Sequence, residues 1–115
     1  MRAAVYSFSL RGAELSKKVG DFLHTLGYEV QVETLPKYAE EAKLPAMVGN
    51  HYQVTEEAFK NCQAIDDVGS VGIAVRSIAP FLKSKLVDPA IISVDERGNF
   101  VIPLVAGHIG GSNEL

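Results

Sequence analysis

The chain has 115 residues, of which 47% are hydrophobic and 22% charged, and its net charge at pH 7 is −3. This balance is typical of one globular domain with a single core, and it excludes a disordered segment. The negative charge gives no electrostatic support for nonspecific nucleic-acid binding. The lone cysteine, Cys62, cannot form an internal disulfide, and no apolar run approaches the roughly 20 residues that span a bilayer. We therefore expect a cytoplasmic protein with neither a membrane nor a nucleic-acid partner.

The first third of the chain has the pattern of a strand, a helix and a second strand. Residues 3–8 form a compact apolar run typical of a buried strand, and residues 9–12 are expected to form a loop. The next apolar residues recur at the spacing of one helix face: Leu15, Val19, Phe22, Leu23 and Leu26. Gly27 is the expected helix end, and residues 28–33 alternate as a half-exposed strand does. This opening predicts a right-handed βαβ unit.

The middle of the chain is less regular. Residues 35–51 contain two prolines and a glycine, which predict a loop with one helical turn near 37–42. A second helix is expected around Thr55, with these residues facing inward: Val54, Ala58, Phe59 and Cys62. Residues 63–68 should form a strand, although Asp66 and Asp67 stand in it and must point to opposite faces. Because an unpaired buried carboxylate is costly, the strand is short, lies at an edge, or gives one aspartate a partner.

The last third predicts a helix and a closing hairpin. Residues 69–72 are a tight loop that opens a third helix, which Pro80 ends or kinks, and a further short turn follows at 81–85. Residues 90–94 are a buried strand, 96–99 turn the chain, and 100–102 return antiparallel. The fold class is therefore α/β: a single domain, residues 1–115, with a mostly parallel sheet, helices on both faces in a Rossmann- or flavodoxin-like three-layer arrangement, and a C-terminal β-hairpin.

Three glycine- or serine-containing loops are candidates for a ligand site, because ligands of such sheets sit beyond the carboxyl ends of the strands. They span residues 7–12, 69–72 and 107–111, and each precedes a predicted helix start that offers free N–H groups. The candidate substrate-binding residues are Ser7, Ser9, Gly69, Ser70, Gly72, Arg76, Gly107, Gly110, Gly111, Ser112 and Asn113. None of the loops has the dinucleotide fingerprint or a Walker A lysine.

Two residues of the last loop are candidates for catalysis. His108 lies among glycines near a predicted helix start, which favours the neutral imidazole, and Glu114 follows it in the same stretch. The simpler explanations are a histidine that hydrogen-bonds its own loop and a glutamate that suits a first helical turn. His24 is expected on a helix surface and His51 in a loop, and the spacing of the three histidines does not fit a metal site.

The second half of the sequence resembles the N-terminal region of cobalamin-biosynthesis proteins of the CbiG type. The stretches that carry the resemblance are VGSVGIAVRSIAP at 68–80, KLVDPA at 85–90, VDERGNFVIPL at 94–104 and GHIGGSNEL at 107–115. The chain departs from the family at Asp66-Asp67, where the family has apolar residues, and it stops where the family continues into another helix and a C-terminal domain. The resemblance therefore implies a fragment or one part of a split protein.

The resemblance also implies a function. Proteins of this type are cobalt-precorrin-5A hydrolases of the anaerobic vitamin B12 pathway, which open a δ-lactone on the macrocycle and release acetaldehyde. The implied substrate is a tetrapyrrole whose acetate and propionate groups suit Arg76, and no protein-bound cofactor is implied because the substrate carries the cobalt. We expect His108 to act as general base and the N–H groups of Gly110 and Gly111 to stabilise the oxyanion. The implied partner is a C-terminal domain or subunit, and homo-oligomerisation stays open.

Two alternatives of other classes remain at this point. The first is a noncatalytic module that binds a corrinoid or another tetrapyrrole, with the same loops but without turnover. The second is a small phosphate- or nucleotide-binding regulator of flavodoxin-like type, which the absence of a phosphate fingerprint disfavours. Release of acetaldehyde from cobalt-precorrin-5A separates the hydrolase from both.

Overall fold

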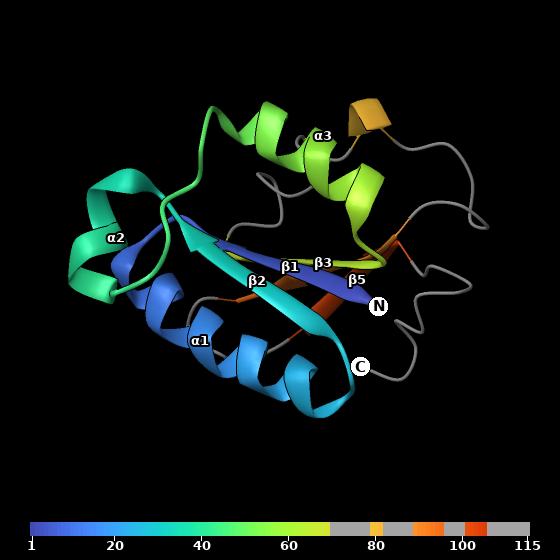
Figure 1. Ribbon diagram of the computed structural model, residues 1–115, viewed down its shortest axis with the longest axis horizontal. Helices are drawn as coiled ribbons and strands as arrows, with labels where there is room; N and C mark the ends of the chain where they lie inside the picture. Colours follow the sequence, from blue (N-terminus) through green and yellow to red (C-terminus); the bar gives the residue numbers. More distant parts are fainter. Residues whose placement is uncertain (70–78, 82–88, 96–100, 106–115) are drawn as a thin grey trace.

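The computed structural model describes residues 1–69, 79–81, 89–95 and 101–105 (Figure 1). Its elements, in chain order, are β1 (Arg2–Ser7), α1 (Leu10–Thr25), β2 (Glu29–Thr34), α2 (Pro36–Ala42), α3 (His51–Asn61), β3 (Ala64–Val68), the 3-10 turn η1 (Ala79–Phe81), β4 (Ala90–Val94) and β5 (Val101–Val105). The predicted third helix, residues 82–85 of the turn predicted at 81–85, and the predicted hairpin turn at 96–99 lie outside the described residues, whereas Phe81 ends η1.

The five strands form one sheet in the order β2-β1-β3-β4-β5. The first four are parallel, and β5 pairs antiparallel with β4. β1, β3 and β4 are almost wholly buried because helices cover their faces, which explains their nearly continuous apolar sequences. β2 lies at an edge of the sheet, and its exposed residues follow the alternation seen in the sequence. The predicted α/β class with a mostly parallel sheet and a C-terminal hairpin is confirmed.

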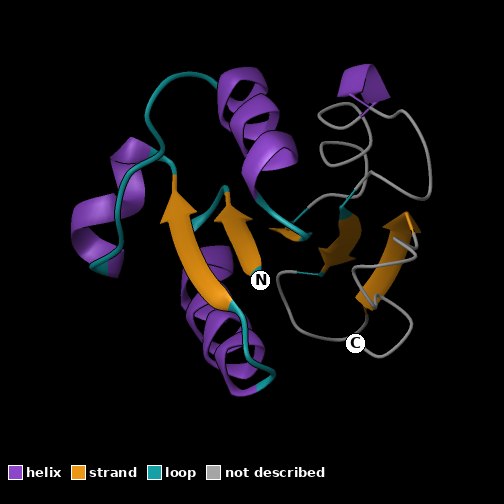
Figure 2. Cartoon of the chain, turned by 45° about the vertical axis from the view of Figure 1, so that its right-hand side comes forward, coloured by secondary structure: helices purple, strands orange, loops and turns teal. Residues whose placement is uncertain are grey.

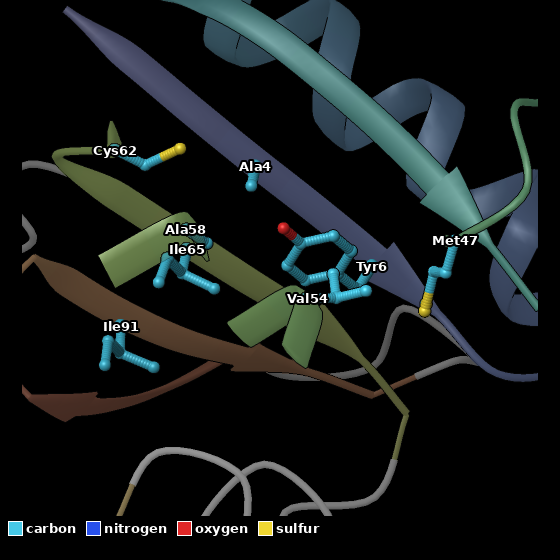
Figure 3. Packing of buried hydrophobic residues seen from close by; sticks show 8 residues of the cluster. All are labelled: Ala4, Tyr6, Met47, Val54, Ala58, Cys62, Ile65 and Ile91. Atoms are coloured by element: carbon cyan, nitrogen blue, oxygen red, sulfur yellow. The ribbon is translucent and has the colours of Figure 1, made fainter. Parts of the chain in front are cut away.

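Helices cover both faces of the sheet (Figures 1 and 2). α1 packs on β1, β2 and β3, and its Leu23 joins an apolar cluster that includes Val5 and Val68. On the opposite face, α3 contributes Val54 and Ala58 to a second cluster. In Figure 3 the side chain of Tyr6 points from β1 toward α3 and lies beside Val54. β1, β3 and β4 therefore divide their side chains between two cores.

The start of α1 corrects one expectation. Residues 9–12 are not a loop, because α1 begins at Leu10 with Ser9 as its N-cap. The Ser9 hydroxyl accepts a hydrogen bond from the Gly12 amide over 2.9 Å, which satisfies one of the free donors of the first turn. Gly12 sits in that turn for a steric reason: a Cβ there would lie 3.3 Å from the carbonyl oxygen of Val68. At the other end, Gly27 adopts φ +97° and ends the helix as predicted.

The start of α3 corrects a second expectation. His51 is the first residue of this helix rather than a loop residue, so the helix starts earlier than the Thr55 region. Asn50 and Gln53 form a reciprocal capping box in which each side-chain oxygen accepts from the other residue's amide over 2.9 Å. Phe81 of η1 packs on this helix, with ring centroids 4.8 Å from Tyr52 and 5.5 Å from Phe59.

The hairpin strand β5 accommodates a proline. Pro103 pairs with Ile92 of β4 beside a register shift between Ile91 and Ile92. Proline lacks the amide that a central strand needs, and it is tolerated at sheet edges and bulges. Within the described residues β5 is the outermost strand on this side of the sheet, so its position agrees with that rule.

Candidate functional site

The strand order defines where a ligand site is expected. The chain passes from β1 outward to β2 and then crosses back to β3 on the other side of β1, so the direction of winding reverses between β1 and β3. In open α/β sheets ligands bind at such a reversal, beyond the carboxyl ends of the strands. Here these ends are Ser7 of β1 and Val68 of β3, and the starts of α1 and α3 follow from the same edge.

On the α1 side of this edge the backbone is tightly packed. Ser7 is fully buried, and within the described part of the chain its hydroxyl has no hydrogen-bond partner. Ser9 caps α1 and Gly12 approaches the end of β3 closely. Gly69 follows β3 with φ +151°, a conformation that favours glycine, and its amide donates to the Val94 carbonyl oxygen over 2.8 Å. The loop after β3 is thereby anchored to the end of β4.

On the α3 side the same edge holds a half-buried histidine and a buried aspartate. Nε2 of His51 lies 3.8 Å from Oδ1 of Asp67, which is longer than a hydrogen bond but within ion-pair distance when the imidazole is protonated. Asp67 is 2% exposed, whereas 21% of the His51 side chain reaches solvent. The imidazole also packs on Phe8, with ring centroids 4.6 Å apart, and meets Tyr6 edge-on at 6.4 Å. We call these two residues the His51–Asp67 pair.

The pair belongs to a row of polar side chains across the sheet. In the register of the sheet, Asp67 of β3 is flanked by Tyr6 of β1 and Ser93 of β4. Among the described residues, neither Oδ1 of Asp67 nor the buried hydroxyl of Ser93 has a hydrogen-bond partner. Burial raises the pKa of the Tyr6 hydroxyl, so Tyr6 is neutral at physiological pH. Buried polar atoms without partners cost free energy, typically about 1–3 kcal/mol each, and they often mark functional positions.

Asp66 lies on the opposite face of β3, away from this row. It is 3% exposed and lines an open cavity of about 250 Å³ whose other walls are mostly apolar residues of α1 and β4. Burial raises the pKa of Asp66 to about 7, and the neighbouring Asp67 carboxyl group adds to the shift. β3 is thus central rather than short or at an edge, and of the two aspartates only Asp67 has an ion-pair partner among the described residues.

The predicted site residues divide into two groups. Ser7, Ser9 and Gly69 lie together at the carboxyl edge between β1 and β3, as the sequence predicts, although the Ser9 hydroxyl serves as a helix cap. The remaining candidates lie outside the described residues: Ser70, Gly72, Arg76, Gly107, His108, Gly110, Gly111, Ser112, Asn113 and Glu114. His24 is exposed at the end of α1, as expected.

The sequence interpretation missed that His51 begins α3 and that it lies beside Asp67 of β3. The signal for His51 was present, because Asn50 followed three residues later by Gln53 is a capping-box pattern that places His51 in a first helical turn. The contact between the start of α3 and the fourth residue of β3 depends on tertiary packing, which no local sequence pattern encodes. In the described ranges no cluster of three or more metal-ligating side chains is present, and none of the described helices is long and apolar enough to cross a membrane.

Comparison with known proteins places this chain in a family. The family model described as cobalamin synthesis G N-terminal matches residues 53–115. Cobalt-precorrin-5A hydrolases from Salmonella typhimurium and Priestia megaterium are 35% and 30% identical to it over 112 residues, or 97% of this chain. The chain spans 30% of the length of each of these relatives.

A solved structure agrees with the sequence comparison. A crystal structure of a cobalamin biosynthesis protein G homolog from Sulfolobus solfataricus superposes with a TM-score of 0.71 at 27% identity, covering 98% of this chain and 31% of that one. The family model covers more than half of the chain and includes β3, β4 and β5. The resemblance seen in the sequence is therefore confirmed, and this chain belongs to the CbiG N-terminal family of cobalamin-synthesis proteins.

Proposed function

We propose that this chain acts in cobalamin biosynthesis as the N-terminal domain of a cobalt-precorrin-5A hydrolase. The observation that carries the proposal is the 35% identity to the Salmonella typhimurium hydrolase across 97% of the chain. The activity of that relative belongs to a protein more than three times as long, so a C-terminal region or a partner subunit completes the enzyme in this proposal. The reaction takes place in the cytoplasm.

The carboxyl edge between β1 and β3 is the proposed substrate site. A cobalt-carrying tetrapyrrole presents several carboxylates, and the starts of α1 and α3 at this edge suit anions because helix N-termini carry a partial positive charge. Ser7 and Gly69 lie at the same edge. The protein itself needs no bound cofactor, since the cobalt belongs to the substrate.

The candidate residues from the sequence can be given roles in the lactone-opening step. Water adds to the lactone carbonyl carbon and the ring C–O bond breaks, which leaves a carboxyl group and a hydroxyl group. His108 takes the proton of the attacking water, and the amides of Gly110 and Gly111 stabilise the oxyanion. Glu114 assists proton transfer, and Arg76 binds a substrate carboxylate.

Acetaldehyde release tests the function. The chain, and a hybrid in which it replaces the aligned 112 residues of the Salmonella typhimurium relative, are incubated with cobalt-precorrin-5A. We expect acetaldehyde, followed through reduction by alcohol dehydrogenase and NADH. A shifted corrin absorbance without acetaldehyde in either form would support the alternative of a noncatalytic corrinoid-binding module. The absence of both signals would contradict both functions.

A further inference from the structure

We infer that the cavity between α1 and β4 is a second binding site, which takes an apolar group that ends in a cation such as an amidinium, a guanidinium or an ammonium. The cavity measures about 250 Å³ and lies on the α1 side of the sheet. Asp66 of β3 provides the negative charge for the ligand. The inference goes beyond the proposed hydrolase function and does not depend on it.

The carboxyl group of Asp66 reaches this cavity without a partner. The residue is 3% exposed, and among the described residues its Oδ1 accepts no hydrogen bond. Its neighbours in the register of the sheet are two apolar residues, Val5 of β1 and Ile92 of β4. Lys18 of α1 also lines the cavity, but no ion pair joins it to Asp66 in the part of the chain that the structure describes. Because an unpaired buried carboxylate is costly, a ligand that brings a positive charge is favoured.

The walls of the cavity define the remainder of the ligand. They are mostly apolar and come from α1 and β4: Val19, Phe22, Leu23, Ile92 and Val94. The volume is below the roughly 300–1,000 Å³ of pockets for drug-sized ligands, so it suits one ring or a short aliphatic chain. Phe22 is 52% exposed, and its ring offers a face to a cation that enters from solvent.

The substrate of the proposed reaction does not fit this cavity. A tetrapyrrole presents carboxylates, which the carboxylate of Asp66 repels, and its macrocycle is larger than the space. Asp66 also lies in the middle of β3, whereas the proposed substrate site is at the carboxyl edge after Ser7 and Val68. Two sources supply a ligand of the inferred chemistry: a free small molecule, and an arginine side chain of another protein segment.

Benzamidine is a suitable probe because it joins one apolar ring to an amidinium, which can donate two parallel hydrogen bonds to a carboxylate. Titration of the ¹⁵N-labelled chain at pH 8 should give saturable shifts of the amide signals around Leu23, Asp66 and Ile92. We expect a dissociation constant of about 1 mM or lower. Benzamide has nearly the same shape without the charge and should bind at least about tenfold more weakly.

Variants of the cavity test the roles of charge and space. Asp66→Asn should weaken benzamidine binding at least about tenfold, because it removes the negative charge. Asp21→Asn removes an exposed carboxylate from α1 and is the matched control, with an unchanged dissociation constant. Val19→Phe enlarges a wall residue and should abolish binding by filling the cavity. This variant keeps the test informative if Asp66→Asn folds poorly.

The pH dependence of binding distinguishes Asp66 from an exposed carboxylate. Burial raises the pKa of Asp66 to about 7, and the Asp67 carboxyl group adds to the shift. The proton on Asp66 competes with benzamidine, so the affinity should fall about tenfold between pH 8 and pH 6. Among the described residues, the other charged groups near this carboxyl are Lys18 on α1 and Asp67 on the opposite face of β3, since Val5 and Ile92 flank it.

A second probe separates the two sources of the ligand. Nα-acetylarginine amide stands in for a protein side chain, and tighter binding of this probe than of benzamidine would indicate a protein segment. Tighter binding of benzamidine would indicate a free small molecule. The absence of saturable shifts with both probes, or a benzamidine affinity that Asp66→Asn and Val19→Phe leave unchanged, would overturn the inference. Acetaldehyde release is measured separately, so either proposal can fail without the other.

Discussion

Asp66 and Asp67 are neighbours in β3, yet their carboxyl groups lie on opposite faces of the sheet and in unlike surroundings. Asp67 faces α3 and the imidazole of His51, whereas Asp66 faces α1 across an apolar cavity. Both are almost fully buried in a central strand. Adjacent residues of a strand point to opposite faces, so each of the two carboxyl groups has surroundings of its own.

Asp66 should make the stability of the protein depend on pH. Its pKa of about 7 lies above the ordinary value of 3.8, so between these values the folded state binds more protons than the unfolded state. The stabilisation that protonated Asp66 provides is present near pH 4 and is lost as the pH rises through 7. Asp66→Asn keeps the shape of the side chain but removes its charge. We expect the variant to be more stable than wild type at pH 8, by at most about 4 kcal/mol.

Urea unfolding at several pH values measures this effect. The difference in unfolding free energy between Asp66→Asn and wild type should grow as the pH rises from about 4 to 8. Asp21→Asn, which removes an exposed carboxylate from α1, is the control and should show a nearly constant difference. A constant difference for Asp66→Asn as well would show that this carboxyl group is solvated in the folded protein.

Leu23 of α1 and Leu26, the C-cap residue of this helix, provide a matched test of the core on the α1 side. Leu23 is 1% exposed and packs against the sheet, whereas Leu26, one turn later, is 47% exposed. Leu23→Ala should lower the free energy of unfolding by about 2–5 kcal/mol, because a cavity remains in the core. Leu26→Ala should change it by less than about 1 kcal/mol. Similar losses in the two variants, measured by urea unfolding, would contradict this packing of α1.

Much of the fold was predictable because the hydrophobic patterns of single segments match the faces that are buried in the structure. The apolar runs of β1 and β4 could belong only to strands covered on both faces, and the helical spacing through Leu23 defined the inner face of α1. The start of α1 was misplaced because Gly12 suggested a loop. In the structure Gly12 is helical, and its lack of a side chain allows close approach to the end of β3.

The candidate site was less predictable, for a physical reason. The loop residues Ser7 and Gly69 could be found because small residues after strands have a local signature. The His51–Asp67 pair joins residues 16 positions apart that belong to different elements, and their meeting depends on how α3 crosses the sheet. The sequence offered a partner for one aspartate as one of three possibilities, but it could not indicate which residue lies beside it.

The capping box at Asn50 should stabilise α3 and hold His51 in place. Asn50→Ala removes the acceptor for the Gln53 amide and should cost about 1 kcal/mol of unfolding free energy. Asn61→Ala, at the exposed end of the same helix, changes the same residue type without removing the N-cap and should cost less. Urea unfolding gives both values. A larger loss for Asn61→Ala would contradict the assigned start of α3.

α1 packs so closely on β2 that a side chain added at Gly20 would clash with Val32, and this closeness can be tested. A Cβ on Gly20 would lie 2.7 Å from Cγ2 of Val32, closer than atoms of these types approach. Gly20→Ala should therefore destabilise the protein by about 1–3 kcal/mol through overpacking, even though alanine favours helix by about 1 kcal/mol.

The second half of this test is a double-mutant cycle. Val32→Ala removes the methyl groups that the new side chain of Gly20→Ala would meet. The double variant should therefore be more stable than the sum of the two single losses predicts. The difference should be at least about 0.5 kcal/mol, the order seen for residues in contact. The comparison is made by urea unfolding of the four proteins. Additive losses would mean that the cost of Gly20→Ala does not come from contact with Val32. A favourable coupling would establish that Gly20 is a glycine because Val32 fills the space its side chain would need.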